Sequence, residues 1–336
     1  MKGTDIIPRL KIGDTVLENV NCAKYLGDQF NSAGTNKDLV EERVKKGQSC
    51  LVNSMSLCSE VTMGMFTIQT LMLLYRSLFL QVVLSDAQAW SNLTNQNIQD
   101  LQVIQLKYLK RMMHTPPSTP TPFVFLETGT LPIEYEIHIK QFTFLHHILT
   151  LDHDDPLRIT YYEQLKYPFE PNWGNEMAEL RSRYGVTESD DNIIVMSKDR
   201  WKGLVKSRVY QKALSDLTPK ASCQKWSTNV NIPSKLECKE YLFKLPSENA
   251  RMLFQIRAGT VDLRSVRKYL YNNNKCRLCD ADEENVEHVI NECPSVSRQY
   301  KVTNVYDENL DQMLEISKRC VEFDKQIKEL DHDLVE

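Results

Sequence analysis

The sequence predicts a mainly α-helical protein with short β-strands at its N-terminus and a compact cysteine-rich module near its C-terminus. Apolar residues recur at helical spacing over most of the 336-residue chain, and proline-rich stretches divide these segments. Four residues of the metal-ligand type cluster between positions 276 and 293. With 41% hydrophobic and 26% charged residues, the composition is that of an ordinary globular protein. The length allows two or three domains of roughly 100–200 residues each.

The N-terminal segment is expected to form β-structure. Residues 10–16 alternate apolar and polar side chains around a glycine-aspartate turn, which favours a short hairpin. Residues 20–26 form a further candidate strand. A helix capped by Thr35 or Asn36 is then expected to run toward Leu51.

The most apolar stretch of the chain covers residues 63–90, and a membrane span is one interpretation of it. Gln69, Arg76 and Gln81 interrupt the stretch, so it contains no uninterrupted window of about 18–20 apolar residues. A buried core helix is therefore the better prediction. Residues 92–111 follow as an amphipathic helix with a basic end, which suits the negative C-terminus of a helix.

Two breaks divide the middle of the chain. Four prolines in residues 115–122 predict a rigid extended connector, and a new helix is expected to begin at Pro132. His146 and His147 on that helix project about 100° apart, so they are interpreted as packing or surface residues rather than as a ligand pair. Residues 152–191 hold 10 acidic and 4 basic residues among several prolines and glycines, which predicts an acidic linker at a domain boundary.

Helices are predicted to resume after this linker. The predicted segments are residues 193–217, 235–245, 247–257 and 261–270, followed by an amphipathic and partly frayed terminal helix over 307–334. Arg264, Arg267 and Lys268 are expected to be exposed on the helix over 261–270. Tyr269 and Tyr271 lie among these cations, an arrangement that suits stacking on nucleic-acid bases.

The pattern Cys276-x2-Cys279-x8-His288-x4-Cys293 carries the most specific chemistry in the sequence. Two cysteines two residues apart on one tight turn can direct both sulfurs at one ion. Three sulfurs and one imidazole nitrogen suit Zn²⁺, and four protein ligands leave no open position for a water molecule. The sequence therefore predicts a structural zinc site of the knuckle type, whose removal would unfold the surrounding segment.

The alternative is a redox pair or a chance Cys-x-x-Cys beside a surface histidine. The cysteine count is odd, at nine, and the sequence shows no secretory signal at its start, which together favour reduced thiols inside the cell. The protein is thus expected in the nucleus or cytoplasm, and not to be secreted. The remaining cysteines are most simply small core residues.

Charge is distributed unevenly along the second half of the chain. Residues 201–279 contain 16 Lys and Arg against 5 Asp and Glu, a net charge of +11, whereas residues 280–336 contain 6 against 16, a net charge of −10. A basic segment beside a zinc knuckle suggests a surface that faces nucleic acid. The alternative is that the two oppositely charged segments pair with each other.

Several segments in order resemble the LINE-type (non-LTR) retrotransposon reverse transcriptases. Lys24-Tyr25-Leu26-Gly27 is similar to the strand of that family that follows the polymerase palm and forms the primer grip. The segment Cys276–Pro294 is similar to the C-terminal knuckle of such elements. Further segments are similar to the thumb region that follows the palm, namely Leu74–Leu78, Ala89-Trp90, Gln105–Arg111, Thr119–Pro122 and Leu126–Pro132.

This resemblance implies a domain division for a chain of mainly α fold class. The implied parts are the end of the palm with a primer-grip-like β segment (1–36), a thumb-like helical domain (37–151), the acidic linker (152–191), a basic helical region (192–275), the CCHC zinc knuckle (276–300) and an acidic C-terminal helix or tail (301–336).

The resemblance also implies that the chain is not an enzyme on its own. The polymerases of this family hold two metal ions on palm aspartates, and those residues precede the strand that Lys24 to Gly27 resembles. Only 23 residues precede Lys24, and they contain no paired-aspartate hairpin. The expected function is therefore non-catalytic binding of RNA or DNA, with no membrane and no small-molecule substrate as partner, unless a longer chain supplies the palm.

The residues expected to contact phosphates are basic and flank the acidic knuckle loop. They are Lys202, Lys206, Arg208, Arg257, Arg264, Arg267, Lys268, Lys275 and Arg277. The competing hypothesis is a helical, zinc-stabilised protein-interaction module that binds no nucleic acid.

Overall fold

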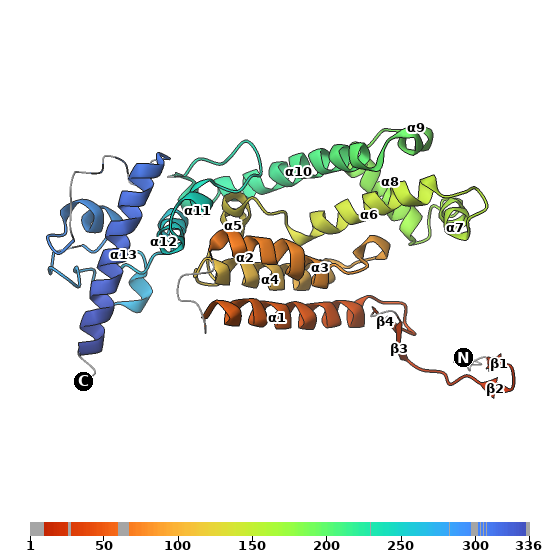
Figure 1. Cartoon of the computed structure of the whole chain (residues 1–336), viewed down its shortest axis with the longest axis horizontal. Helices are drawn as coiled ribbons and strands as arrows, with labels where there is room; N and C mark the ends of the chain where they lie inside the picture. The colour runs from red at the N-terminus through yellow and green to blue at the C-terminus, as the bar shows by residue number, and fades with distance from the viewer. Residues whose placement is uncertain are drawn as a thin grey trace.

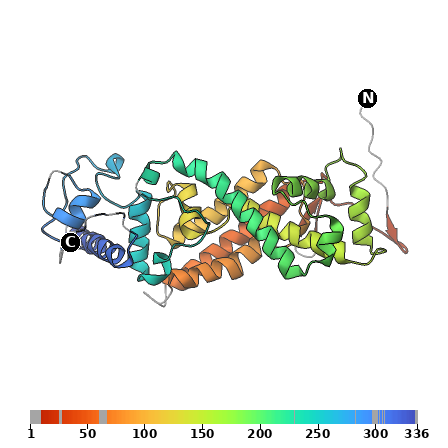
Figure 2. The same ribbon diagram turned by 90° about the horizontal axis from the view of Figure 1, so that it is seen from above.

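The computed structural model describes residues 10–25, 28–59, 67–228, 230–281, 283–296, 302, 304, 306 and 308–333. These residues form a mainly helical molecule, as predicted, with two short antiparallel strand pairs at the N-terminus. The molecule is elongated, with the N-terminal strands at one end and the C-terminal helix α13 at the other (Figure 1). Figure 2 shows the same succession of helices from above. Among the described residues, no helix is both long enough and apolar enough to cross a lipid bilayer.

The two strand pairs confirm the predicted N-terminal β-structure. Strands β1 (Lys11–Ile12) and β2 (Thr15–Val16) form the expected hairpin. Strand β3 (Cys22–Tyr25) lies where a further strand was predicted, and it pairs with β4 (Asp28–Asn31), which the sequence did not indicate.

The first helices build the central body of the molecule. They are α1 (Lys37–Ser59), α2 (Ile68–Leu74), α3 (Leu80–Val83), α4 (Asn95–Met112), α5 (Thr121–Thr128) and α6 (Ile133–Thr150). A π-helical segment, Tyr75–Phe79, joins α2 to α3, so residues 68–83 of the apolar stretch form the predicted helix, which is buried on one side. Residues 63–66 of that stretch lie outside the described residues. Gly47 of α1 lets this helix pack tightly, because a Cβ there would lie 2.8 Å from Cγ2 of Val83 and 3.2 Å from Cγ1 of Ile104.

The predicted extended connector is only partly correct. Residues 115–120 are non-helical, but α5 begins at Thr121 and places Pro122 in its first turn. A proline is tolerated there because the first backbone N–H groups of a helix have no intrahelical acceptor. Helix α6 begins directly after Pro132, as predicted. His146 is buried and His147 is exposed, so both histidines are packing or surface residues, as predicted.

The segment 152–191 is part of the helical core and is not a linker. It contains α7 (Pro156–Gln164) and α8 (Trp173–Arg183), and both helices pack against α6. Trp173, Met177 and Leu180 recur at helical spacing and are buried against the core. Only three of the ten acidic residues that suggested a linker lie on these helices, namely Glu163, Glu176 and Glu179, and none of the ten is buried.

Residues 235–240 of the helix expected over 235–245 are non-helical, so that prediction holds only for its last turn. The remaining helices otherwise differ from the sequence-based expectations mainly in their boundaries. They are α9 (Asp190–Val195), α10 (Lys198–Ser222), α11 (Tyr241–Lys244), α12 (Ser247–Ala258) and α13 (Leu310–Asp333). The prediction of a helix over 261–270 is wrong, because only the single 3₁₀ turn Lys268–Leu270 forms there. Helix α13 packs against α12 through buried residues that include Ile316 and Phe323, so its described part is not a frayed tail.

Candidate metal centre and its basic flank

The four predicted metal ligands lie on two short segments that meet beside α13. Cys276 and Cys279 occupy a turn in which the N–H of Asp280 donates to the carbonyl of Cys276 over 3.0 Å. Asp280 closes this turn with a positive φ of 61°, a conformation that aspartate tolerates better than most residues. His288 begins the π-helical turn His288–Glu292, and Cys293 follows it directly. Each segment thus supplies two ligands.

The ligand atoms of these four residues all lie within 4.8 Å of one another. The Sγ atoms of Cys276 and Cys293 are 3.9 Å apart, and the Sγ of Cys279 is 3.3 Å from Nε2 of His288. A tetrahedral Zn²⁺ ion, with bonds of about 2.3 Å to sulfur and about 2.0 Å to nitrogen, separates its ligand atoms by about 3.5–3.8 Å. A disulfide would require sulfurs about 2.05 Å apart, so the geometry is that of a metal cage and not of a disulfide.

A carboxylate lies on the far side of the His288 imidazole. Its Nε2 faces Cys279, whereas its Nδ1 lies 3.5 Å from Oε2 of Glu292. A carboxylate in this position is the usual partner of a metal-ligating histidine, because it fixes the tautomer and turns the other nitrogen toward the ion.

Burial favours the neutral form of the cage thiols in the absence of a cation. It raises the pKa of Cys276 to about 12, and it also raises the pKa of Cys293. A thiolate is the form that binds metal, so a cation in the cage would displace these protons. The donor set of three sulfurs and one imidazole nitrogen therefore fits a soft or borderline divalent ion. Within the described ranges, no other group of three or more His, Cys, Asp or Glu residues is placed to hold a metal ion.

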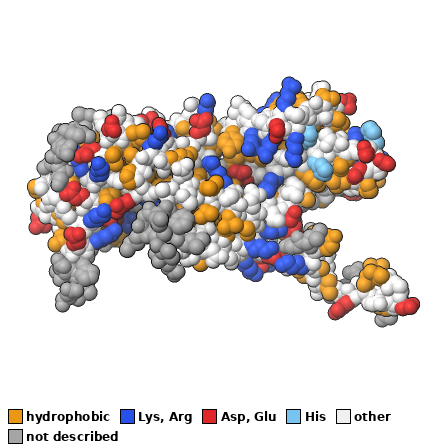
Figure 3. Space-filling view, viewed as in Figure 1, with side chains coloured by type: hydrophobic (Ala, Val, Ile, Leu, Met, Phe, Trp, Pro, Cys, Tyr) orange, Lys and Arg blue, Asp and Glu red, His pale blue; other side chains and the backbone are white. Residues whose placement is uncertain are grey.

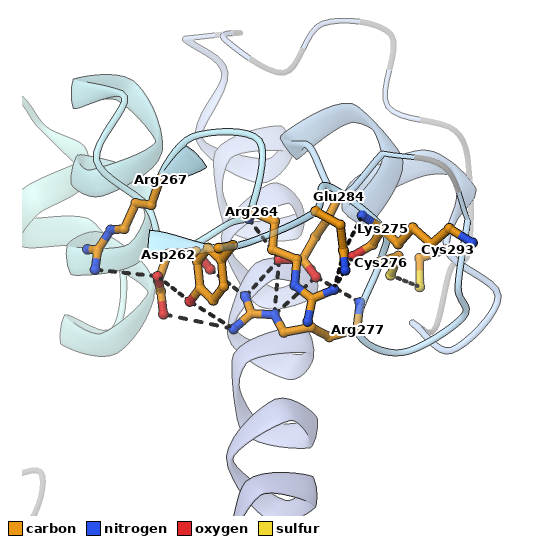
Figure 4. Close-up of polar contacts among 10 residues, drawn as sticks. Asp262, Arg264, Arg267, Lys275, Cys276, Arg277, Glu284 and Cys293 are labelled. Atoms are coloured by element: carbon orange, nitrogen blue, oxygen red, sulfur yellow. Dashed lines mark hydrogen bonds and ion pairs between the residues drawn. The ribbon is translucent and has the colours of Figure 1, made fainter. Parts of the chain in front are cut away.

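A buried ion pair supports the turn that carries Cys276 and Cys279. The carboxylate of Glu284 is fully buried and accepts hydrogen bonds from the Arg277 side chain at 2.7–3.1 Å and from the Arg277 backbone N–H at 2.8 Å. It also accepts a hydrogen bond from the backbone N–H of Arg264 at 3.0 Å. Figure 4 shows Glu284 surrounded by these donors beside the cysteines. In the sequence, Glu284 is only one of several acidic residues of the knuckle loop, and nothing there indicates that it supports the turn.

Helix α13 holds the second ligand segment. Nη1 of Arg319 donates to the carbonyl of Ile290 over 2.7 Å, and Nε2 of Gln326 donates to the carbonyl of Ser295 over 3.0 Å. Val289 and Ile290 are fully buried. The metal cage and α13 therefore form one packed unit.

The nine basic residues expected to contact phosphates fall into two groups. Lys202, Lys206, Lys268 and Lys275 are exposed. The arginines instead contact other groups of the protein. Arg208 contacts Gly185 and Glu188, and Arg264 contacts Asn273 and the Lys275 carbonyl. Arg267 contacts Asp262 and the Thr260 carbonyl, Arg277 contacts Glu284, and Arg257 contacts Glu127.

Arg257 is the extreme member of this group. Its side chain is 1% exposed, and Nε donates to Oε1 of Glu127 over 2.8 Å. Its guanidinium does not face solvent in this arrangement, so it offers no surface for a phosphate.

The primer-grip-like segment is described only in its first half. Lys24 and Tyr25 lie on β3 and are exposed, and Nζ of Lys24 is 3.0 Å from Oε1 of Glu42 on α1. Leu26 and Gly27 lie outside the described residues.

Comparison with known proteins found no match among protein-family models, curated proteins or solved structures. The functional assignment therefore rests on the residues themselves.

Proposed function

We propose that Cys276, Cys279, His288 and Cys293 hold one structural Zn²⁺ ion. The ion would join the two ligand segments and would have no open coordination position, so it would act in folding rather than in catalysis. Purified protein is expected to carry one zinc per chain by elemental analysis. A Cys293→Ser variant is expected to carry none, whereas Cys223→Ser, which alters an exposed cysteine outside the cage, should keep the ion.

The chain is proposed to be the non-catalytic, nucleic-acid-binding C-terminal portion of a retrotransposon RNA-directed DNA polymerase. The ordered resemblance to the thumb and knuckle of LINE-type elements supports this assignment. On this proposal the protein binds RNA or DNA inside the cell, in the nucleus or cytoplasm, and any polymerase chemistry belongs to a palm supplied by other sequence.

The observation that carries nucleic-acid binding is the exposure of the predicted lysines. Lys202 and Lys206 lie four residues apart on α10, so they project from one face of that helix. Figure 3 shows Lys and Arg side chains gathered over the region of α10 and α6. Lysines on a flexible stem bind phosphate groups without reading sequence, and the affinity they contribute falls as salt rises.

The second candidate function is a zinc-stabilised protein-interaction module. The internal ion pairs favour it, because Arg267 and Arg277 of the basic segment pair with Asp262 and Glu284 rather than facing solvent. Part of the positive charge is thus neutralised within the molecule.

A salt titration separates the two functions. The parent protein and a Lys202→Ala/Lys206→Ala variant are compared for binding to labelled RNA and duplex DNA between low and physiological salt. If both lysines contact phosphates, the slope of log K against log salt decreases by about 0.9 per lysine on duplex DNA.

A double substitution of the exposed Lys37 and Lys107 on α1 and α4 is the control, because it removes the same charge elsewhere. Equal effects of the two double variants would indicate a general charge effect rather than a site on α10. Absence of any binding at low salt would favour the protein-interaction module.

A further inference from the structure

A cleft of about 610 Å³ lies between the C-terminal end of α12 and the loop that precedes α5. Its walls come from parts of the chain that are distant in sequence, namely residues 116–120, 223–226, 256–260 and 266–269 together with Tyr306. This size is within the range of pockets that bind small organic groups. The cleft is separate from the metal cage, none of whose ligands lines it.

The charge of the cleft favours an anionic ligand. Its basic lining residues are Lys225, Arg257 and Arg267, and no Asp or Glu lines it among the residues that the structure describes. Arg257 and Arg267 are paired with Glu127 and Asp262, so the exposed Lys225 is the lining cation that faces a ligand. A larger hollow of about 930 Å³ between α12 and α13 differs in this respect, because Glu248, Asp262 and Asp324 line it together with basic residues. The smaller cleft is therefore the better site for a phosphate-bearing ligand.

The aromatic residues of the cleft suit a planar ligand. Tyr269 is 77% exposed on the 3₁₀ turn Lys268–Leu270, beside the exposed Lys268. Trp226, from the segment 223–226, also lines the cleft and is 6% exposed.

The two tyrosines of this region have different environments. Tyr271 is half-buried, with its hydroxyl 3.1 Å from Oδ1 of Asp262 and the guanidiniums of Arg264 and Arg277 at 5.6 and 5.2 Å from its ring centroid. Its ring is thus occupied by contacts within the protein. The ring of Tyr269 has no such contact among the described residues and faces solvent.

We infer that this cleft binds one nucleotide unit of a single-stranded nucleic acid, with its base stacked on Tyr269 and its phosphate contacted by the exposed side chains of Lys225 and Lys268. This inference rests on the proposed nucleic-acid-binding function. It adds a second binding site, which prefers single strands to duplexes. Bases of a duplex are already stacked on one another, whereas unpaired bases can stack on an exposed aromatic ring.

The test uses the full-length, zinc-loaded chain and fluorescence anisotropy with a labelled 12-nucleotide single strand and a duplex of the same length. Tyr269→Ala is expected to weaken single-strand binding roughly 5- to 100-fold, the usual effect of removing one stacking ring. Duplex affinity should change less than about twofold. Tyr269→Phe keeps the ring and should lose much less single-strand affinity than Tyr269→Ala.

Phe169→Ala is the matched control. Phe169 is 99% exposed in the loop between α7 and α8, at the other end of the molecule from α12 (Figure 1). Its removal should leave both affinities unchanged. Equal single-strand binding by Tyr269→Ala and the parent would overturn the inference while leaving the proposed function in place. No oligonucleotide binding by the parent at low salt would instead refute the proposed function, and the inference with it.

Competition with uridine monophosphate tests whether the cleft binds one unit of a strand or a free nucleotide. The mononucleotide should displace the 12-mer only at concentrations far above the dissociation constant of the 12-mer, because it lacks the additional phosphate contacts. Displacement at concentrations equal to that constant would identify a free-nucleotide site and would overturn the assignment to a strand.

Discussion

Arg257 and Glu127 form an ion pair that lies almost wholly inside the protein, with 1% and 3% of their side chains exposed. Substitution of Arg257 by alanine is expected to lower the free energy of unfolding by about 3–5 kcal/mol, because it leaves the carboxylate of Glu127 buried without its partner. Urea unfolding of the purified variant measures this change.

Lys268→Ala is the control for this substitution, since removal of an exposed lysine usually changes stability by less than about 0.5 kcal/mol. The opposite pattern, in which Arg257→Ala keeps full stability but reduces the salt dependence of nucleic-acid binding, would restore Arg257 as a phosphate contact.

His138 makes the stability of the protein sensitive to acid. Its Nδ1 lies 2.6 Å from the hydroxyl of Tyr184, and burial, followed by the nearby charge of Arg183, lowers the pKa of His138 to about 3. The unfolded chain takes up this proton near pH 6.5, whereas the folded protein does not until about pH 3. The contribution of His138 to the free energy of unfolding should therefore be fully present above pH 6.5. As the pH falls from 6.5 to 3, this free energy should decrease by up to about 1.4 kcal/mol per pH unit.

Unfolding free energies measured at pH 7.5 and pH 5 check this prediction. His138→Gln cannot take up the proton, so it should flatten the acid dependence even if the variant is less stable overall. Burial chiefly lowers the pKa of His114 to about 4, so His114 adds a similar acid dependence of stability, which remains in the His138→Gln variant. An unchanged slope in His138→Gln would contradict the assignment.

At the scale of single residues, the sequence identified the four clustered candidate ligands because their spacing is itself the signal. It could not identify Glu284 or separate the lysines from the arginines, because a count of charges contains no information on burial. The guanidinium group has five N–H donors in a plane and is weakly hydrated, so it is suited to internal pairing in a way that the ammonium group is not.

The end of helix α5 depends on a single glycine. Gly129 ends the helix in the left-handed conformation, with φ of 61°, and a Cβ atom there would overlap the backbone of Glu237 and Cys238. Gly129→Ala should therefore destabilise the protein by well over the roughly 1 kcal/mol that the backbone conformation alone costs an alanine. Thermal unfolding followed by circular dichroism measures the loss.

Gly259, which ends α12, provides the comparison. Its φ is 65°, but no heavy atom lies within 4 Å of a Cβ built there, so Gly259→Ala should cost only about 1 kcal/mol. Similar losses for both variants would mean that the backbone near Cys238 moves away to accommodate the side chain.

At the scale of elements, hydrophobic spacing predicted α4 and α6 well because both are long and have a capping residue or a proline at their start. Helices α7 and α8 were missed because their acidic, breaker-rich composition obscured a short apolar pattern, although the spacing of Trp173, Met177 and Leu180 could have revealed α8. Residues 261–267 have no helix because their backbone contacts Glu284, a long-range contact that local sequence does not encode.

At the scale of the molecule, the metal cage should stabilise the C-terminal end without stabilising the helices around α6. Removal of zinc by a chelator is expected to expose residues 261–296 and α13 to protease, because small metal modules derive much of their folding energy from the ion. The helices α1 to α10 contribute most of the buried apolar residues of the described chain and should stay protected. Limited proteolysis with mass spectrometry, with and without chelator, locates the cleavage sites.

The control is re-addition of zinc, which should restore the original pattern. Unchanged cleavage near Cys276 after verified metal loss would show that packing against α13 is sufficient for this end of the chain. Cleavage throughout α1 to α10 would show that the molecule unfolds as one cooperative unit.

The contact of Arg319 with Ile290 also affects how the protein is made. The ribosome releases the segment with the four ligands before it releases α13, so the cage cysteines emerge without the helix that covers them. Until α13 emerges, newly made chains would present soft sulfur ligands to the surrounding solvent. Binding of an ion during translation would shorten the time for which the cage cysteines are exposed to oxidants.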